Sequence, residues 1–347
     1  MQGISPSGVR GRGHSHCAEP RPPEAHNINA IRFPERSIFV IYRNFDELIG
    51  RLRAGDGGAP AVRTVAVVAA DDAHTLEAVA HAAREGLVFP LLIGNRERIE
   101  RALAALPEPL PDYEIHTADS GTEAALHAAA LVKSGEAHFI MKGNIQTPEL
   151  MKALLGKDAD FRTGSLISHL NLVEIPNYHK LVAISDVALI IAPTLEQKAG
   201  IIENAVASLT RMGFDAPKVA VLAASENVNP KMPETVDAAE LKAMNNDGRL
   251  TGCIVEGPLS YDLAISREAA EIKGLDSPVC GDADLLVVPS IAAGNMLVKA
   301  LRYSAEARTA AIVSGGRAPL VLPSRATDAD NKFLPIAVAA AASRSSL

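Results

Sequence analysis

The chain of 347 residues has no tryptophan, and aromatic residues make up only 4% of it. Its apolar mass therefore consists of Ala, Val, Leu and Ile, which is typical of parallel strands covered by Ala-rich helices. No apolar run approaches the roughly 18 residues that a membrane-spanning helix needs. These absences indicate a globular protein with no transmembrane helix.

Cysteine is also scarce, and acidic residues outnumber basic ones, 41 to 34. The three cysteines, Cys17, Cys253 and Cys280, form no CxxC pair and no even-numbered set. This excludes a disulfide framework and a structural zinc site, and it predicts a reducing, cytoplasmic location. The formal net charge of −7 argues against a general nucleic-acid-binding protein. An anionic substrate would then require a local cluster of Arg or Lys.

Residues 1–43 begin with a stretch, 1–27, that contains Arg and Pro but no apolar h-region, so it does not form a secretory signal. This composition cannot repay the entropy of ordering, and we predict a disordered leader. From Arg63 onward, short β-rich runs alternate with helical patterns, which predicts a doubly wound α/β fold. Three closely spaced β-like runs predict a hairpin or mixed segment in mid-chain; they are 166–174, 180–184 and 187–192. A single helix is expected over 263–272.

Ligands of such sheets lie beyond the C-terminal ends of the strands, so the loops there are candidate sites. The run 141–147 places Lys142, Gly143, Asn144 and Thr147 at the start of a helix. Helix N-termini suit phosphate because they offer unpaired N–H groups and a positive dipole end. We expect Thr147 to be the N-cap. The Walker A spacing is missing, so an ordinary capped helix remains an open alternative.

A second candidate cluster is Ser314–Arg317 with Ser324-Arg325, followed by Asp328 and Asp330. Arg offers a planar fork for phosphate, and a Ser beside it can donate to an oxyanion. A nearby carboxylate can accept a thiol proton. The alternative is a helix N-terminus whose acids complement the dipole.

Other polar positions are weaker candidates. Arg162, Ser168 and His169 form a cluster before and within a β-like run, and Lys152 follows one turn into a helix. His169 on an apolar strand is more often a hydrogen-bonded interior imidazole than a base. Asp282 and Asp284 look like a turn, and no metal-binding or GxGxxG motif is present.

Six segments of the chain closely resemble the phosphate acetyl/butyryltransferase family, in particular its butyryltransferase branch and the acetyltransferase half of fused enoyl-CoA hydratase enzymes. They are MKGNIQTPELMKALL (141–155), FRTGSLISH (161–169), NVNPKMPET (227–235), GPLSYDLAIS (257–266), DADLLVVPSIAAGNMLVKAL (282–301) and SGGRAPLVLPSRATDAD (314–330). They span most of residues 60–345 in the family's order.

The resemblance implies a two-domain α/β fold like that of the isocitrate and isopropylmalate dehydrogenases, with a cleft between the domains. Residues 44–165 plus 311–347 would form domain I, and residues 166–310 would form domain II. The C-terminal strand and helix would thus return to domain I. A homodimer is expected from the family.

The resemblance also implies the reaction acyl-CoA + phosphate = acyl phosphate + CoA through a ternary complex. Coenzyme A would be a substrate, with no permanently bound cofactor and no metal. Asp330 would be the base, with Asp328 as a competitor, Ser324 would stabilise the oxyanion, and Arg325 would hold phosphate. Further substrate contacts are expected from Lys142, Gly143, Asn144, Thr147, Lys152, Arg162, Ser168, His169, Asp262, Asn295 and Arg317.

Two other functions stay open at this stage. An NAD(P)-dependent dehydrogenase of the same fold would need several carboxylates converging on a divalent metal. A non-catalytic acyl-CoA-binding protein would keep the fold without the chemistry. The acyl chain length is not fixed by the sequence.

Overall fold

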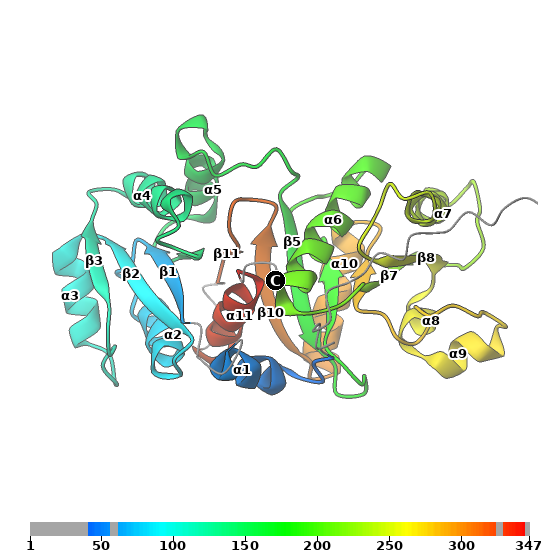
Figure 1. The fold of residues 1–347 in the computed structure, drawn as a ribbon, viewed down its shortest axis with the longest axis horizontal. Coiled ribbons are helices and arrows are strands. Elements are labelled where there is room, and N and C mark those ends of the chain that lie inside the picture. Colours follow the sequence, from blue (N-terminus) through cyan, green and yellow to red (C-terminus); the bar gives the residue numbers. More distant parts are fainter. Residues whose placement is uncertain (1–40, 56–61, 324–328, 344–347) are drawn as a thin grey trace, which may run out of the picture. The chain divides into compact units, whose positions relative to one another are not determined.

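The computed structural model describes residues 41–55, 62–323 and 329–343. The strands in this part are β1 (Arg63–Val68), β2 (Val88–Gly94), β3 (Glu114–Thr117), β4 (Phe139–Lys142), β5 (Ser168–Glu174), β6 (Val182–Ser185), β7 (Lys218–Leu222), β8 (Ile254–Leu259), β9 (Leu285–Val287), β10 (Arg308–Ser314) and β11 (Leu320–Val321). They form one sheet in the order β3-β2-β1-β4-β11-β10-β5-β6-β9-β7-β8 (Figure 1).

Helices cover both faces of this sheet (Figure 1). They are α1 (Phe45–Ala54), α2 (Ala73–Arg84), α3 (Arg96–Ala104), α4 (Gly121–Ser134), α5 (Thr147–Leu155), α6 (Leu195–Met212), α7 (Pro233–Asn246), α8 (Tyr261–Ile265), α9 (Arg267–Ile272), α10 (Ile291–Ser304) and α11 (Ala329–Ala342), with a 3-10 turn at Lys157–Ala159. Successive residues of β1 enter opposite cores: Val65 and Val67 belong to the apolar cluster that includes residues of α1, α2, α6 and α11, whereas Ala66 and Val68 belong to the cluster that includes residues of α4 and α5. This period of two confirms that β1 is a central strand buried on both faces. None of the described helices is long and apolar enough to cross a membrane.

The predicted mixed segment is confirmed in the middle of the sheet. Strand β10 runs antiparallel to both β11 and β5, and β5 runs antiparallel to β6. The pairs β1–β2, β1–β4 and β4–β11 on one side are parallel, as are β6–β9, β7–β9 and β7–β8 on the other. Three successive antiparallel pairings therefore make the strands of the second parallel set run in the opposite direction to those of the first. The expectation that ligands lie beyond the C-terminal strand ends applies to each set separately.

The third run of that segment, residues 187–192, is not a strand, so this prediction is wrong. The carboxylate of Asp186 accepts hydrogen bonds from the backbone N–H groups of Ala188 and Leu189, both at 2.8 Å. The Asp186 side chain thus occupies two backbone N–H groups that could otherwise pair with a neighbouring strand. The chain bends there and continues to α6, whose N-cap Thr194 forms a capping box with Gln197.

Two helix predictions also need correction. The N-cap of α5 is Gln146, which makes no side-chain cap, and Thr147 is already helical. The single helix expected over 263–272 is two helices, α8 and α9. Ser266 lies between them with extended backbone, and its side chain accepts a hydrogen bond from the N–H of Ala269. Ser competes well for such a capping position, which is why the helix is interrupted here.

The C-terminal segment returns to the first half of the sheet, as expected. Strand β11 pairs in parallel with β4, with Leu320 opposite Ile140 and Val321 opposite Met141. Helix α11 packs against α2 and β10. This return brings residues about 180 positions apart in sequence side by side, whereas the division into two domains stays a prediction.

Tyr42, which the sequence assigns to a disordered leader, is a buried residue. It is only 2% exposed, its hydroxyl donates to the Met212 carbonyl at 2.7 Å, and its ring contacts Phe214. The packed chain thus begins before residue 44. Residues 1–40 lie outside the described part.

An ion-pair network lies at the N-terminal ends of β6, β7 and β9. The buried ammonium group of Lys180 contacts Asp282 at 2.8 Å and Asp284 at 2.7 Å, while Lys218 and His179 also pair with Asp282. Burial alone would raise the pKa of Asp282, but hydrogen bonds from Lys180, Lys218 and His179 outweigh it and hold that pKa well below its usual range. Asp282 and Asp284, which the sequence pattern places in a turn before β9, thus serve as the carboxylate partners of Lys180 and Lys218.

Replacing Asp282 by Asn should destabilise the protein by about 1–3 kcal/mol at pH 7, the usual worth of hydrogen bonds to a charged group. Because the folded-state pKa is depressed, this stability is present above the unfolded pKa of about 3.9 and is lost as the pH falls through the folded pKa. Urea unfolding of both proteins from pH 7 to pH 3 checks this. The curves should converge toward acid; a difference that grows toward acid would contradict it. Asp247→Asn, at an exposed pair with Arg249, is the control and should change little at any pH.

Candidate active site

The loop after β4 carries the first group of predicted residues. Lys142 is the last residue of the strand and only 6% exposed, and its Nζ donates to the carbonyls of Gly143 at 3.1 Å and Ile145 at 3.0 Å. The N–H of Asn144 donates to the Ala69 carbonyl at 2.7 Å. Because β4 pairs in parallel with β1, their C-terminal ends lie together, and the loop after β1 becomes part of the site.

Gly143 is required at this junction by a close approach of two backbones. Its N–H donates to the Val68 carbonyl at 2.8 Å. A Cβ built on it would lie 2.4 Å from the Ala69 oxygen and 2.7 Å from the Val68 oxygen. Both contacts are with main-chain atoms, which cannot rotate away.

Replacing Gly143 by Ala should therefore destabilise the protein by about 1–3 kcal/mol, a typical cost of overpacking. The midpoint of urea unfolding is the measurement. Gly50→Ala is the matched control, because Gly50 is exposed in α1 and a Cβ there meets nothing within 4 Å. That change should be neutral or stabilising by up to about 1 kcal/mol. If Gly143→Ala and Gly50→Ala change the unfolding midpoint equally, the close approach of the two backbones is not the reason that Gly143 is required.

A hollow of about 310 Å³ opens beside this loop. It is lined by Asp72, His74, Thr75, Lys142, Gly143, Asn144, Pro323 and Lys332. Of these residues, Lys142, Gly143 and Asn144 were predicted from the sequence, whereas Asp72, Thr75 and Lys332 were not. The expectation that ligands lie beyond the C-terminal strand ends could have found Asp72 and Thr75, because Asp72 caps α2, the helix after β1, and Thr75 lies in its first turn. Lys332 is contributed by α11, and only the return of the C-terminus brings it here.

Asp72 and Lys332 face each other across part of this hollow. Asp72 is the N-cap of α2, and its Oδ2 accepts from the N–H of Thr75 at 2.9 Å and from the Thr75 hydroxyl at 2.5 Å. Lys332 is only 4% exposed, and its Nζ lies 4.0 Å from the same oxygen. Among the described residues that line this hollow, two lysines outnumber one carboxylate, and this positive balance suits an anion.

A second predicted group gathers around the turn between β10 and β11. Ser168 pairs with Ser314 across the sheet, and its hydroxyl accepts from the Asn204 side chain at 2.9 Å. Arg162 forms a backbone bridge with Gly316 and is exposed. The guanidinium group of Arg317 forms an ion pair with the Asp160 carboxylate at 2.9 Å. In this structure Arg317 therefore binds a carboxylate of the same chain.

His169 is not the fully hydrogen-bonded interior imidazole that the strand pattern favours. Its Nδ1 is buried and has no hydrogen-bond partner among the described residues, and its backbone N–H donates to Asp186 at 2.8 Å. Burial lowers the pKa of His169, with the Asp186 carboxylate acting in the opposite direction. The ring is therefore neutral near pH 7.

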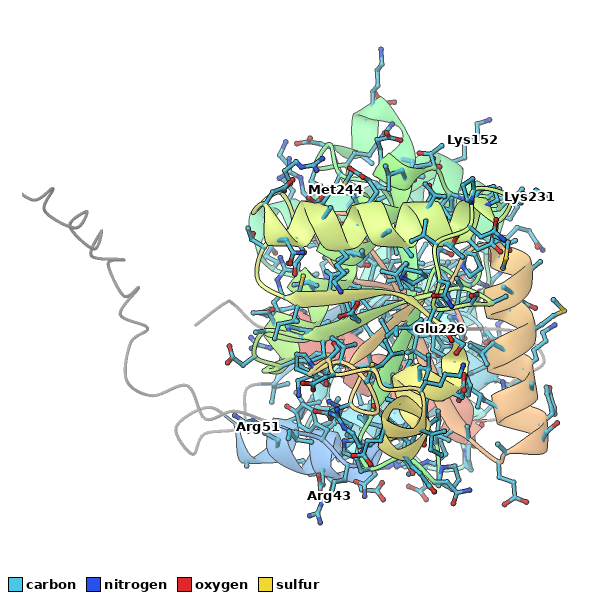
Figure 2. All side chains as sticks on the ribbon, turned by 90° about the vertical axis from the view of Figure 1, so that its right-hand side faces the viewer. Arg43, Arg51, Lys152, Glu226, Lys231 and Met244 are labelled. Carbon is cyan, nitrogen blue, oxygen red and sulfur yellow. The ribbon has the colours of Figure 1, made fainter. Side chains whose placement is uncertain are left out.

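The remaining predicted contacts lie on other elements. Lys152 is exposed on α5 and extends outward from the ribbon in Figure 2. Thr147 is exposed at the start of the same helix. Asp262 lies in α8, 3.9 Å from the Lys273 ammonium group, and Asn295 in α10 donates to the Val187 carbonyl at 3.3 Å. Ser324, Arg325 and Asp328 lie outside the described residues, while the backbone of Asp330 belongs to α11.

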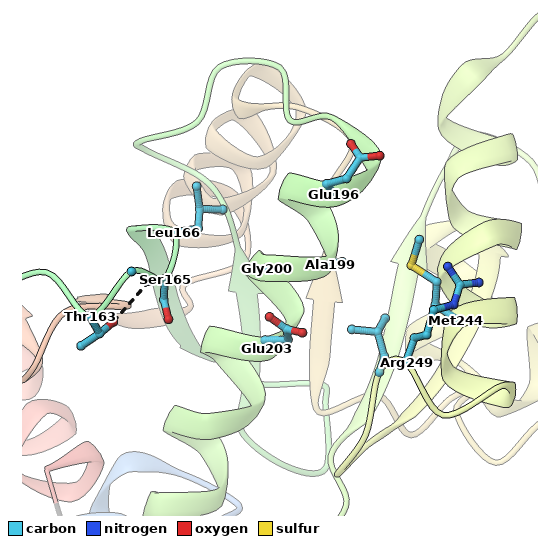
Figure 3. Close-up of a pocket in the computed structure, with 11 residues that line it drawn as sticks. Thr163, Ser165, Leu166, Glu196, Ala199, Gly200, Glu203, Met244 and Arg249 are labelled. Carbon is cyan, nitrogen blue, oxygen red and sulfur yellow. Dashed lines mark hydrogen bonds between the residues drawn. The ribbon is translucent and has the colours of Figure 1, made fainter.

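A larger hollow of about 560 Å³ does not fit an anionic ligand. Figure 3 shows Glu196 and Glu203 of α6 on one side of it and Arg249 with Met244 on the other. Arg249 is already paired with Asp247 at 2.7 Å and Glu240 at 3.6 Å. The two carboxylates thus dominate its charge, and volume alone does not make it the phosphate site. Within the described ranges, no three His, Cys, Asp or Glu side chains converge as a metal site would require.

Comparisons with known proteins decide the family. Residues 113–340 match the family described as Phosphate acetyl/butaryl transferase. The chain is 44% identical over 278 residues to the phosphate acetyltransferase of Thermotoga maritima, covering 80% of this chain and 94% of that protein. It is 36% identical over 298 residues to the phosphate butyryltransferase of Clostridium acetobutylicum, covering 86% and 97%. The chain belongs to the phosphate acetyl/butyryltransferase family.

Solved structures agree with this phosphate acetyl/butyryltransferase assignment. A branched-chain phosphotransacylase from Enterococcus faecalis superimposes with a TM-score of 0.73 at 32% identity, covering 81% of this chain and 99% of that one. A 4-hydroxythreonine-4-phosphate dehydrogenase from Klebsiella pneumoniae reaches a TM-score of 0.54 at 14% identity, covering 82% and 98%. The second likeness concerns the fold alone, and it confirms the expected dehydrogenase-like α/β architecture.

Proposed function

We propose that this protein transfers an acyl group between coenzyme A and inorganic phosphate, in the reaction acyl-CoA + phosphate = acyl phosphate + CoA. Membership of the phosphate acetyl/butyryltransferase family supports the reaction class. One structural observation supports the location. Pro323 and Lys332, which bracket Ser324–Asp330 in the sequence, line the same positively balanced hollow as Lys142 and Asn144.

The proposed chemistry proceeds in a ternary complex. Asp330, or in its place Asp328, accepts the proton of the CoA thiol, whose ordinary pKa of about 8.5 leaves it mostly protonated at pH 7. The thiolate attacks the carbonyl carbon of acyl phosphate, and the tetrahedral intermediate then expels phosphate with the electrons of the C–O bond. Ser324 donates to the oxyanion, and Arg325 binds the phosphoryl oxygens.

Lys142, Gly143, Asn144, Thr147 and Lys152 would line the phosphate side of this site. Arg162, Ser168, His169, Asp262, Asn295 and Arg317 would contact the rest of the substrates. The cleft between residues 44–165 plus 311–347 and residues 166–310 is part of the same proposal. Coenzyme A enters as a substrate rather than as a resident cofactor, and the proposed location is the cytoplasm.

We also propose that the protein is a homodimer that associates through α10. Met296 and Tyr303, seven residues apart on one face of this helix, are 65% and 77% exposed. Ile191 is 75% exposed, and its carbonyl accepts from the N–H of Ile291 at the start of the helix. A second copy of the same apolar stripe could cover these side chains. Sedimentation equilibrium should give twice the chain mass; a monomer at assay concentrations contradicts the proposal.

The direct test of the reaction follows CoA release from acetyl-, propionyl- and butyryl-CoA with and without phosphate, together with the formation of acyl phosphate. We expect phosphate-dependent CoA release with at least one of these esters. CoA ester binding in calorimetry without turnover would overturn the proposal and favour a non-catalytic binding protein. The relative rates also report the acyl chain length that the pocket accepts.

A further inference from the structure

Lys332 is a buried cation without a close partner in the described part of the chain. Its side chain is about 95% buried, yet the one acidic group near it among the described side chains is Asp72, whose Oδ2 lies 4.0 Å from Nζ. That distance is beyond hydrogen-bond length. The same oxygen already accepts two hydrogen bonds from Thr75. A buried ammonium group left in this state forfeits most of the solvation it would have in water.

The surroundings of Lys332 indicate what should complete its coordination. Its side chain lines the 310 Å³ hollow together with Lys142, and both lysines are at most 6% exposed. The hollow has the volume of roughly ten water molecules, at about 30 Å³ each, so it can hold a phosphate group with neighbouring atoms. Helix α2 also begins there, and the positive end of its dipole favours an anion. Neither lysine is placed to serve as a solvated surface charge.

We propose that Lys332 binds a dianionic phosphate group of the substrates in this hollow, opposite Lys142. The inference rests on the proposed acyl transfer and names a contact that neither the sequence motifs nor the family resemblance assigned. The phosphate group could be that of inorganic phosphate and acyl phosphate, or the 3′-phosphate of coenzyme A. In either case the ammonium group exchanges a distant carboxylate for phosphate oxygens at hydrogen-bond distance.

The test compares wild-type protein with Lys332→Met and Lys332→Arg, and with Lys157→Met as a control at an exposed lysine outside the hollow. Calorimetry with inorganic phosphate alone, and with CoA against dephospho-CoA, measures binding without turnover. Steady-state kinetics give KM for phosphate and for the CoA ester. Urea unfolding of each variant separates lost binding from lost folding.

Lys332→Met should weaken binding of one phosphate source by about 10- to 100-fold, because a hydrogen bond to a charged group is lost. Lys332→Arg should recover part of this loss, and Lys157→Met should match wild type. If Lys332→Met binds inorganic phosphate more weakly than wild type does, the bound group is that of phosphate and acyl phosphate. If Lys332→Met no longer binds CoA more tightly than dephospho-CoA, the bound group is the 3′-phosphate of coenzyme A. If a folded Lys332→Met protein keeps both affinities, the inference is wrong.

These outcomes also separate the inference from the proposed function. A wild-type protein that binds phosphate through Lys332 but turns over no CoA ester would refute the acyl transfer alone. A wild-type protein that turns over, with a Lys332→Met variant whose KM values are unchanged, would refute the phosphate contact alone.

Discussion

Asp330→Asn is expected to lower kcat by about 10²- to 10⁴-fold, the usual contribution of general acid–base catalysis. The amide keeps the size of the carboxyl group but cannot accept the thiol proton. KM for acyl phosphate should change little, because phosphate binding is assigned to other groups. The assay is the initial rate of acyl-CoA formation at saturating CoA and acyl phosphate.

Raising the pH gives an internal check on this variant. Above the pKa of the thiol, near 8.5, the nucleophile ionises without help, so the deficit of Asp330→Asn should shrink there. Asp328→Asn is the matched comparison, since it removes an identical group two residues away. Full activity of Asp330→Asn together with loss of activity in Asp328→Asn would transfer the role of base to Asp328.

Arg325→Ala is expected to raise KM for acyl phosphate by roughly 10²-fold, because a bidentate guanidinium–phosphate contact loses hydrogen bonds worth about 1.5–3 kcal/mol each, partly offset by water. KM for CoA should stay within about threefold. Arg325→Lys should recover only part of the loss, since a point charge replaces a planar fork.

The control for this change is Arg308→Ala. Arg308 is exposed at the start of β10 and pairs with Asp46 at 3.4 Å and Glu174 at 3.3 Å. Removing it should leave both KM values unchanged. If Arg308→Ala raises KM for acyl phosphate as much as Arg325→Ala does, the effect is a general one of net charge and the assigned contact is wrong.

The phosphate side of the site shows how prediction from sequence succeeded and where it stopped. Lys142 and Gly143 could be found because a local pattern, a strand followed by a Gly-containing loop and a helix, suffices to define an anion-binding turn. The reason Gly143 must be glycine is not local. It is the approach of the backbone just after β1, whose Ala69 oxygen lies 2.4 Å from the position that a Cβ would occupy.

Errors in the secondary-structure prediction arose where side chains replace regular backbone pairing. Residues 187–192 have the composition of a strand, but Asp186 takes the N–H groups of Ala188 and Leu189. Ser266 likewise divides a continuous helical pattern into α8 and α9 by capping the second one. In both places a single polar residue outcompetes the periodicity of its neighbours.

The amino-acid sequence by itself determined the α/β class, the mixed segment in mid-chain and the acyltransferase family, because these depend on local periodicity and on contiguous motifs. The tertiary structure alone decided that Lys332 shares a hollow with Lys142 and Asp72, that Arg317 is occupied by Asp160, and that the larger hollow carries the wrong charge. For Lys332 and Arg317 the physical reason is the parallel pairing of β11 with β4, a contact between segments about 180 residues apart. For the larger hollow it is the approach of Arg249 to α6. No local pattern encodes either contact.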